Sequence, residues 1–123
     1  MQIFCLGSDN PGDIRAHQIG KELKVPGMKF IIIRDLDQFM QETDGLDHIV
    51  IMDVVKGIKG VELIEDYDRI RSNGICSMHD FDIGFYLKLQ KELGRKITVI
   101  GLGDNAEEDE VRRIASGLKS EPL

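Results

Sequence analysis

Aromatic side chains are scarce in this sequence, which contains no Trp, two Tyr and five Phe. Proteins that bind single-stranded nucleic acid stack its bases on aromatic side chains and neutralise its phosphates with clustered Lys and Arg. Here the 16 basic residues are scattered along a chain whose formal net charge is -6. These features argue against nucleic acid as the main partner and leave small molecules, metals and other proteins.

Cysteines and long apolar runs are also scarce. The two cysteines, Cys5 and Cys76, are too far apart for a CxxC site and too few for a disulfide framework. No apolar run approaches the roughly 20 residues that cross a bilayer, and the first residues carry no basic leader. We therefore expect a cytoplasmic protein in which residues 1–123 form one domain, a length sufficient for a single core.

The usual motifs of several enzyme classes are missing. The glycines in "CLGSDNPG" and "GLGDN" match neither GxGxxG nor GxxxxGK[ST], so a nucleotide site has little support. The sequence has no GxSxG nucleophile elbow. Cys5 falls inside an apolar run and is expected to be a small buried hydrophobe, and no electropositive setting is evident around Cys76.

The chain instead shows a regular alternation of strand-like and helix-like segments. Strands are expected at 3–6, 29–33, 48–53 and 96–103, and helices at about 13–24, at 35–43, from 77 onward and at 106–118. The segment 59–67 alternates more weakly, which suits an edge strand and is compatible with an antiparallel direction. Because parallel neighbours need crossover connections, the pattern predicts an α/β fold: a three-layer α/β/α sandwich with a roughly five-stranded, mostly parallel sheet.

Helical spacing also predicts which side chains face the core. The expected inward residues are Ala16, Ile19, Gly20 and Leu23; Leu36, Phe39 and Met40; Ile83, Phe85, Tyr86, Leu87, Leu89 and Leu93; and Val111, Ile114, Ala115 and Leu118.

Asp53 ends the strand expected at 48–53, within the stretch "HIVIMDVVKGIKG". An acid after four apolar residues either caps the strand or belongs to a site, because a buried carboxylate without a partner is costly. In open α/β sheets, ligands bind outside the carboxyl ends of the strands. Asp9 and Asp13 follow the first strand and His79 opens the third helix, so these side chains are expected at the same edge.

Asp13, Asp53 and His79 form a candidate divalent-metal site, because carboxylate oxygen and neutral imidazole nitrogen suit nickel, zinc or manganese. Each residue alone has a simpler explanation: Asp13 as a helix N-cap, Asp53 as a strand cap and His79 as a surface histidine. A helix N-terminus helps to keep His79 neutral and able to bind metal. His17 is expected to be a solvated helix residue, and His48 to lie at the opposite end of the sheet.

The segment 47–64, "DHIVIMDVVKGIKGVELI", resembles the phosphoacceptor segment of response-regulator receiver domains, in which a strand ends at the phosphorylated Asp. This resemblance implies that Asp53 accepts a phosphoryl group in the presence of magnesium. Receivers, however, carry an acidic pair directly after the first strand and a Lys after the last one. Here those strands end in "LGSDN" and "IGLGDN".

A second resemblance covers nearly the whole chain. "LGSDNPGDIRAHQIGKEL" resembles the strand, turn, acid and helix that open hydrogenase maturation endopeptidases, and "IVIMDVVKGIKGVEL" resembles their strand ending in Asp with a Gly-containing hairpin. "SMHDFDIGFYLKLQKELG" is similar to their Ser-x-His-Asp segment and helix, and "ITVIGLG" to their final strand. The most specific part of the likeness is the order of Ser77, His79, Asp80, Gly84, Leu87, Gly94 and Gly101.

The second resemblance implies a nickel-dependent, aspartic-type endopeptidase that trims the C-terminus of a [NiFe]-hydrogenase large subunit precursor. It further implies that the substrate protein supplies the nickel, that no permanent cofactor is held, and that Asp13, Asp53 and His79 are the metal-contacting catalytic residues. Asp9 is the alternative first ligand, because it replaces the second Gly of the family's turn and the loop before Asp13 is shortened. The shortened loop also leaves open a catalytically inactive, metal-binding relative.

Overall fold

The computed structural model describes residues 1–7, 14–66 and 81–119 and contains a five-stranded sheet. The strand order is β2-β1-β3-β5-β4. β1 is parallel to β2 and to β3, and β3 is parallel to β5, whereas β4 pairs with β5 in the antiparallel direction. The strands are β1 (Gln2–Cys5), β2 (Lys29–Ile32), β3 (His48–Lys59), β4 (Val61–Ile64) and β5 (Lys96–Asp104).

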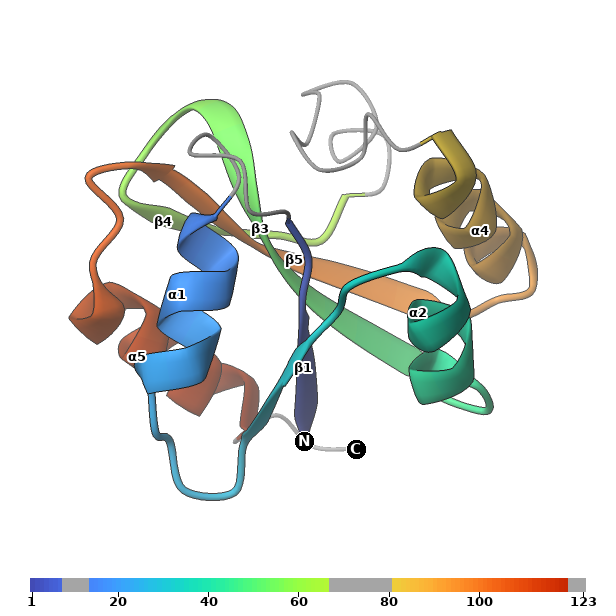
Figure 1. Ribbon diagram of the computed structural model, residues 1–123, viewed down its shortest axis with the longest axis horizontal. Helices are drawn as coiled ribbons and strands as arrows, with labels where there is room; N and C mark the ends of the chain where they lie inside the picture. The colour runs from blue at the N-terminus through green and yellow to red at the C-terminus, as the bar shows by residue number, and fades with distance from the viewer. Residues whose placement is uncertain (8–13, 67–80, 120–123) are drawn as a thin grey trace.

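Helices cover both faces of this sheet (Figure 1). α1 and α5 lie on one face, and α2 and α4 lie on the other. This arrangement confirms the predicted α/β fold, including its antiparallel edge strand. The helices of the described ranges are α1 (Arg15–Glu22), α2 (Leu36–Thr43), α4 (Phe81–Glu92) and α5 (Glu108–Lys119), and none of these has the length and apolar content of a membrane span.

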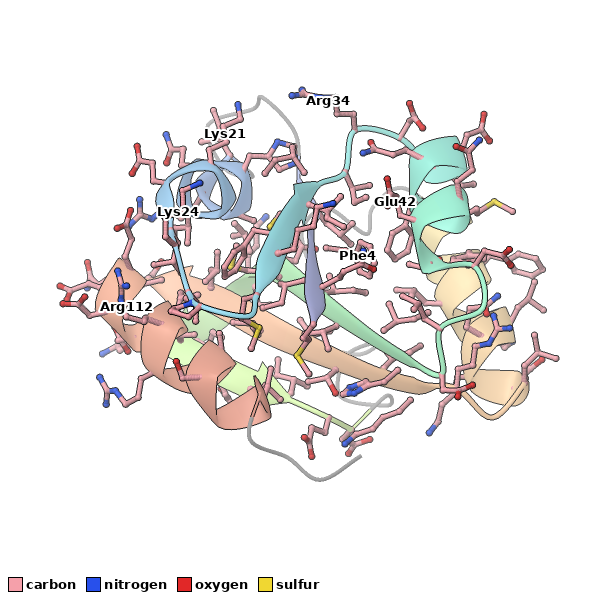
Figure 2. The ribbon with its side chains drawn as sticks, turned by 90° about the horizontal axis from the view of Figure 1, so that it is seen from below. Phe4, Lys21, Lys24, Arg34, Glu42 and Arg112 are labelled. Carbon is pink, nitrogen blue, oxygen red and sulfur yellow. The ribbon has the colours of Figure 1, made fainter. Side chains whose placement is uncertain are left out.

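Alternation along the strands produces two separate cores, as expected for a sheet that is covered on both faces. On β3, Val50 and Met52 belong to the core under α1 and α5, whereas Ile49 and Ile51 belong to the core under α2 and α4. In the second core, the ring of Phe4 meets the ring of Phe39 on α2 edge to face, with centroids 5.9 Å apart. Figure 2 shows Phe4 between β1 and α2.

The apolar faces predicted for α1 and α5 are confirmed. Their inward side chains are the buried residues Ala16, Ile19, Leu23, Val111, Ala115 and Leu118 and the partly buried Ile114 and Gly20. Two arginines also tie each of these helices to the segment next to the other. Arg15 Nη2 donates to the Ala106 carbonyl, just before α5, at 3.1 Å, and Arg112 Nη1 donates to the Lys24 carbonyl, just after α1, at 3.0 Å. Lys24 and Arg112 lie close together in Figure 2.

The faces predicted for α2 and α4 are only partly correct. On α2, Phe39 is buried, but Met40 is exposed. On α4, Leu87 is fully buried, yet the structure exposes three apolar side chains that were predicted to face the core: Phe85 and Leu89 on the helix and Leu93 directly after it. A helix presents a stripe only about 100° wide to a sheet, whereas the apolar residues of α4 are spread around most of its circumference.

Gln38 fastens the start of α2 to the edge strand β2. Asp35 is the N-cap residue of α2, and its Oδ1 accepts a hydrogen bond from the Gln38 amide at 2.8 Å. The carboxamide of Gln38 turns back, donating to the Ile32 carbonyl at 2.8 Å and accepting from the Arg34 amide at 2.7 Å. A parallel neighbouring strand would bond this same carbonyl and amide, so the Gln38 side chain occupies the place of one residue of such a strand.

β3 is longer than the sequence predicted, because it continues past Asp53 to Lys59. β3 pairs with β5 as far as Val54, which lies opposite Leu102, and after a register shift it pairs again where Lys59 meets Asp104. Asp53 and Gly57 of "DVVKGIKG" look like the end of a strand, but β3 continues through them to Lys59, where it pairs with β5 again.

Gly60 and Gly103 close the hairpin between β3 and β4. Gly60 has a φ of 66°, which favours glycine, and its carbonyl accepts from the Gly103 amide at 2.8 Å. At Gly103 a Cβ atom would lie 2.2 Å from the carbonyl oxygen of Ile58, so only glycine fits there. On the α5 side, Oε2 of Glu110 accepts from the Val61 amide at 3.4 Å and holds the turn against the helix.

Candidate functional site

Asp53 lies within β3, one residue past the last pair with β1 and therefore beside the carboxyl end of that strand. The last paired residues of β1 and β3 are Cys5 and Met52, and the Leu6 amide donates to the Met52 carbonyl at 3.0 Å. The chain leaves β1 for β2 on one side and later returns to β3 on the other side. Asp53 therefore lies at the point where the strand order reverses, which is where open α/β sheets bind their ligands.

The side chain of Asp53 is fully buried, and its Oδ1 accepts a hydrogen bond from the Val54 amide at 2.8 Å. By strand alternation Asp53 falls on the same face as Ile49 and Ile51, the face that α2 and α4 cover. α4 leads into the amino end of β5, so the helix begins toward the carboxyl edge of the sheet (Figure 1). Asp53 thus shares both a face and an edge with the start of α4.

The thiol of Cys5 is buried in the adjacent strand. Burial and, to a smaller extent, the negative charge of Asp53 raise the pKa of Cys5 to about 12. The thiol is therefore protonated at neutral pH, which confirms that Cys5 is a buried apolar residue rather than a nucleophile.

The histidines His17 and His48 lie in different parts of the sheet. His17 is buried, with Nε2 3.2 Å from the carbonyl oxygen of Ile33, so the prediction that it is solvated is wrong. A carbonyl only accepts, and Nε2 therefore carries the proton. His48 begins β3 at the amino end, as predicted, and its Nε2 lies 2.7 Å from the hydroxyl oxygen of Thr98.

Of the predicted metal-site residues, Asp53 is the one that the structure places. Asp13, His79 and the alternative ligand Asp9 lie outside the described residues, as does the expected start of a helix at Ser77. Within 1–7, 14–66 and 81–119, no three His, Cys, Asp or Glu side chains gather as metal ligands. In the sequence, Asp13 and His79 each stand two positions before a helix, α1 and α4 respectively.

Three solved structures share this fold. A [NiFe] hydrogenase maturation protease, HybD, from Thermococcus kodakarensis has a TM-score of 0.61 and 16% identity, over 95% of this chain and 97% of that one. An endopeptidase from Escherichia coli has a TM-score of 0.57 and 16% identity, over 97% and 90%. An uncharacterized protein from Wolinella succinogenes has a TM-score of 0.52 and 15% identity, over 96% and 92%. No family model and no curated protein sequence matches the chain.

These likenesses establish the fold. They extend over nearly the full length of each chain, so the antiparallel edge strand and the helices on both faces belong to an arrangement that a maturation protease also has. At about one identical residue in six, they do not establish activity, metal or substrate. Those properties have to be argued from the residues of this chain.

Proposed function

We propose that this chain is a cytoplasmic endopeptidase that removes the C-terminal peptide of a [NiFe]-hydrogenase large subunit precursor after contacting the nickel that the precursor carries. The observation that carries the proposal is the position of Asp53, a fully buried carboxylate at the point where the strand order reverses. The fold is shared with a protein named as a hydrogenase maturation protease, and the order of the sequence motifs follows the same family.

In this proposal, Asp13, Asp53 and His79 contact the nickel of the substrate, with Asp9 as the alternative to Asp13. Carboxylate oxygen and neutral imidazole nitrogen are suitable nickel ligands. The hydrogen bond from the Val54 amide fixes one oxygen of Asp53, so the carboxylate is already oriented before the substrate arrives. Around a buried carboxylate the effective dielectric constant is lower than in water, which strengthens its attraction for a cation.

The burial of Asp53 determines how the substrate reaches it. Because its side chain has no exposed surface, the precursor has to open the carboxyl edge of the sheet before its nickel meets the carboxylate. We therefore expect free nickel to bind weakly and loaded precursor to bind well. The bound nickel, or a carboxylate attached to it, then activates a water molecule for attack on the nearby peptide bond.

The receiver alternative fits the fold less well. In the doubly wound order 2-1-3-4-5, the fourth strand lies between the third and the fifth. Here β5 pairs directly with β3, and β4 lies at the edge in the antiparallel direction. The residues at the end of β5, from Gly101 to Asp104, also lack the lysine that a receiver carries there.

The test compares nickel-loaded with nickel-free large-subunit precursor and measures loss of the C-terminal peptide by mass spectrometry. We expect cleavage of the loaded precursor only, and cleavage slower by about a hundredfold in Asp53→Asn and in His79→Ala, because loss of a partner that only orients a metal ligand already costs about 10–100-fold. Asp47→Asn is the matched control, because Asp47 is exposed and lies just before the amino end of β3. Its rate should equal that of the wild type.

Two other results would change the conclusion. If the loaded precursor from the same organism binds but keeps its tail, the chain is an inactive relative and the peptidase proposal fails. If cleavage is normal in Asp53→Asn and His79→Ala, the function stands and the site is elsewhere. Incubation with acetyl phosphate and magnesium, followed by mass measurement, tests the receiver alternative, and we expect no phosphorylation of Asp53.

A further inference from the structure

The outer surface of α4 carries a row of apolar side chains, here named the α4 stripe and consisting of Phe85, Leu89 and Leu93. Leu93 directly follows the helix, and its amide donates to the Leu89 carbonyl at 3.0 Å, so it continues the helical turn. The three side chains are 57%, 40% and 70% exposed. Residues four apart lie above one another on a helix, so these three form one continuous row. Single exposed apolar residues are ordinary on a protein surface, whereas a contiguous row of large ones is typical of an interaction site.

Two opposite charges lie beside this row. At 3.6 residues per turn, Lys88 and Glu92 project from the same side of the α4 stripe, one turn apart, and both are exposed. On the other side of the stripe lies Tyr86, whose hydroxyl is bonded to Thr43 of α2. One flank of the stripe therefore carries the two charges of Lys88 and Glu92, whereas on the other flank Tyr86 packs against α2 of the same molecule.

We propose that the α4 stripe binds a second copy of this chain, with the two α4 helices antiparallel and related by a two-fold axis at Leu89. In this register the two Leu89 side chains, one from each copy, meet at the axis. Phe85 of one copy then lies on the same side of the axis as Leu93 of the other copy. Such self-complementary contacts are the commonest way in which soluble proteins form dimers. Rows of residues four apart interlock when two helices cross at about -50°, a common packing class.

Charge complementarity selects the second copy and its antiparallel direction. About a two-fold axis at Leu89, the charged flank of one helix faces the same flank of the other. Lys88 then lies about 3 Å along the helix axis from Glu92 of the second copy, at a rise of about 1.5 Å per residue, and the pair occurs twice. In a parallel arrangement the charged flank faces Tyr86, and neither Lys88 nor Glu92 meets an opposite charge.

The small size of the stripe implies a weak dimer. Three apolar side chains and their neighbours bury less than the roughly 1,200 Å² of a standard stable interface. We therefore expect the copies to exchange rapidly and to associate at high micromolar concentration. The proposal concerns the outer face of α4 alone and holds whether or not the chain is a peptidase.

Sedimentation velocity of the full chain, from about 10 μM to about 1 mM, tests the proposal over the range in which weak association is populated. We expect the average mass to rise from 13.9 kDa toward that of a dimer. Leu89→Glu places like charges opposite each other at the axis and should remain monomeric throughout. Gln41→Glu, at an exposed position on α2, adds the same charge elsewhere and should behave like the wild type.

Charge reversal tests the register separately from the apolar contact. Lys88→Glu and Glu92→Lys should each weaken association severalfold, and the double variant should regain it. If net charge alone governed association, the two single variants would act in opposite directions, because one makes the acidic chain more acidic and the other less. Positions 88 and 92 are exposed, so we expect neither substitution to disturb the core. Circular dichroism of each variant is used to check that it is folded.

A wild type that stays monomeric over the whole range overturns the proposal and leaves the α4 stripe for a different partner. Association that survives Leu89→Glu in a folded variant places the contact elsewhere and also overturns it. Opposite effects of the two single charge reversals, or no recovery in the double variant, would rule out the antiparallel register.

Discussion

The hydroxyl oxygens of Thr43 and Tyr86 lie 2.6 Å apart and join α2 to α4. Oγ1 of Thr43 is also 2.7 Å from the Phe39 carbonyl, which only accepts, so Thr43 donates to Phe39 and receives the hydrogen bond of Tyr86. The ring of Tyr86 meets that of Phe39 edge to face, with centroids 5.6 Å apart. These contacts hold α4 against α2, and in the sequence the segment with His79 leads directly into α4.

Tyr86→Phe should therefore lower the free energy of unfolding by about 1 kcal/mol, the usual net contribution of one such hydrogen bond. The ring contact with Phe39 is kept in this variant. Urea unfolding of the wild type, Tyr86→Phe, Thr43→Val and the double variant measures the coupling between the two side chains. If Tyr86→Phe lowers the free energy of unfolding by the same amount in the wild type and in the Thr43→Val variant, the hydrogen bond between the two hydroxyls contributes nothing to stability.

Gly103→Ala should strongly destabilise the protein. The new Cβ atom would lie 2.2 Å from the Ile58 carbonyl oxygen, so β3 and β5 have to separate at the hairpin. We expect a loss of about 3 kcal/mol or more in the free energy of unfolding, typical of severe overpacking against backbone. Thermal and urea unfolding measure it.

Gly117→Ala is the matched control for that substitution. A Cβ at Gly117, on α5, meets no atom within 4 Å. Because alanine favours helix over glycine by up to about 1 kcal/mol, this variant should be unchanged or slightly more stable. Similar destabilisation by both substitutions would show that close packing at Gly103 is not the cause.

The buried thiol of Cys5 makes stability depend on alkaline pH. Its pKa is raised to about 12 in the folded protein, against about 8.5 in an unfolded chain, so the folded state holds the proton more tightly. This contribution is complete below about pH 8.5 and is lost as the pH rises toward 12. Between about pH 9 and 12 the free energy of unfolding should fall by up to about 1.4 kcal/mol per pH unit from this group.

Cys5→Ala removes this titration and isolates it from other groups. Urea unfolding at several pH values from about 8 to 10.5 should show a shallower decline for Cys5→Ala than for the wild type. Asp53→Asn should also flatten the decline, though less, because burial is the larger cause of the shift. Parallel curves for all three proteins would contradict the assigned pKa.

Asp35→Ala tests the cap of α2. Oδ1 of Asp35 accepts from the Gln38 amide at 2.8 Å, and loss of an N-cap acid costs about 1 kcal/mol. Asp37→Ala is the control, because Asp37 is exposed in the first turn and contributes only through the helix dipole. A decrease in stability for Asp37→Ala as large as that for Asp35→Ala would show that charge, rather than capping, stabilises the helix.

The order and direction of the elements could be predicted from the sequence because they depend on local periodicity. The continuous apolar run in 48–53 and the helical spacing in 106–118 each indicate one type of element, and the rule for parallel neighbours then gives a mostly parallel sheet. The same rule places Asp53 at the carboxyl edge, where the structure has it. Asp13 and His79 stay predictions, because they lie outside the described residues.

The errors concern properties that depend on tertiary neighbours. His17, about one turn past Asp13, was predicted to be a solvated helix residue, but it is buried, and the carbonyl of Ile33, from a different segment, gives its ring a partner. α4 is apolar around most of its circumference, so the sequence could not show which side meets the sheet. β3 was predicted to end at Asp53, and only its pairing with β5 shows that it continues.

The carboxamide of Gln38 has a consequence for the behaviour of the protein at high concentration. An open sheet edge is a template on which strands of other molecules align, and growth of that kind leads to aggregation. Gln38 bonds the Ile32 carbonyl and the Arg34 amide, so this pair of backbone groups on β2 is not available to a strand of another molecule. A side chain in the first turn of α2 therefore also limits the enlargement of the sheet by a neighbouring molecule.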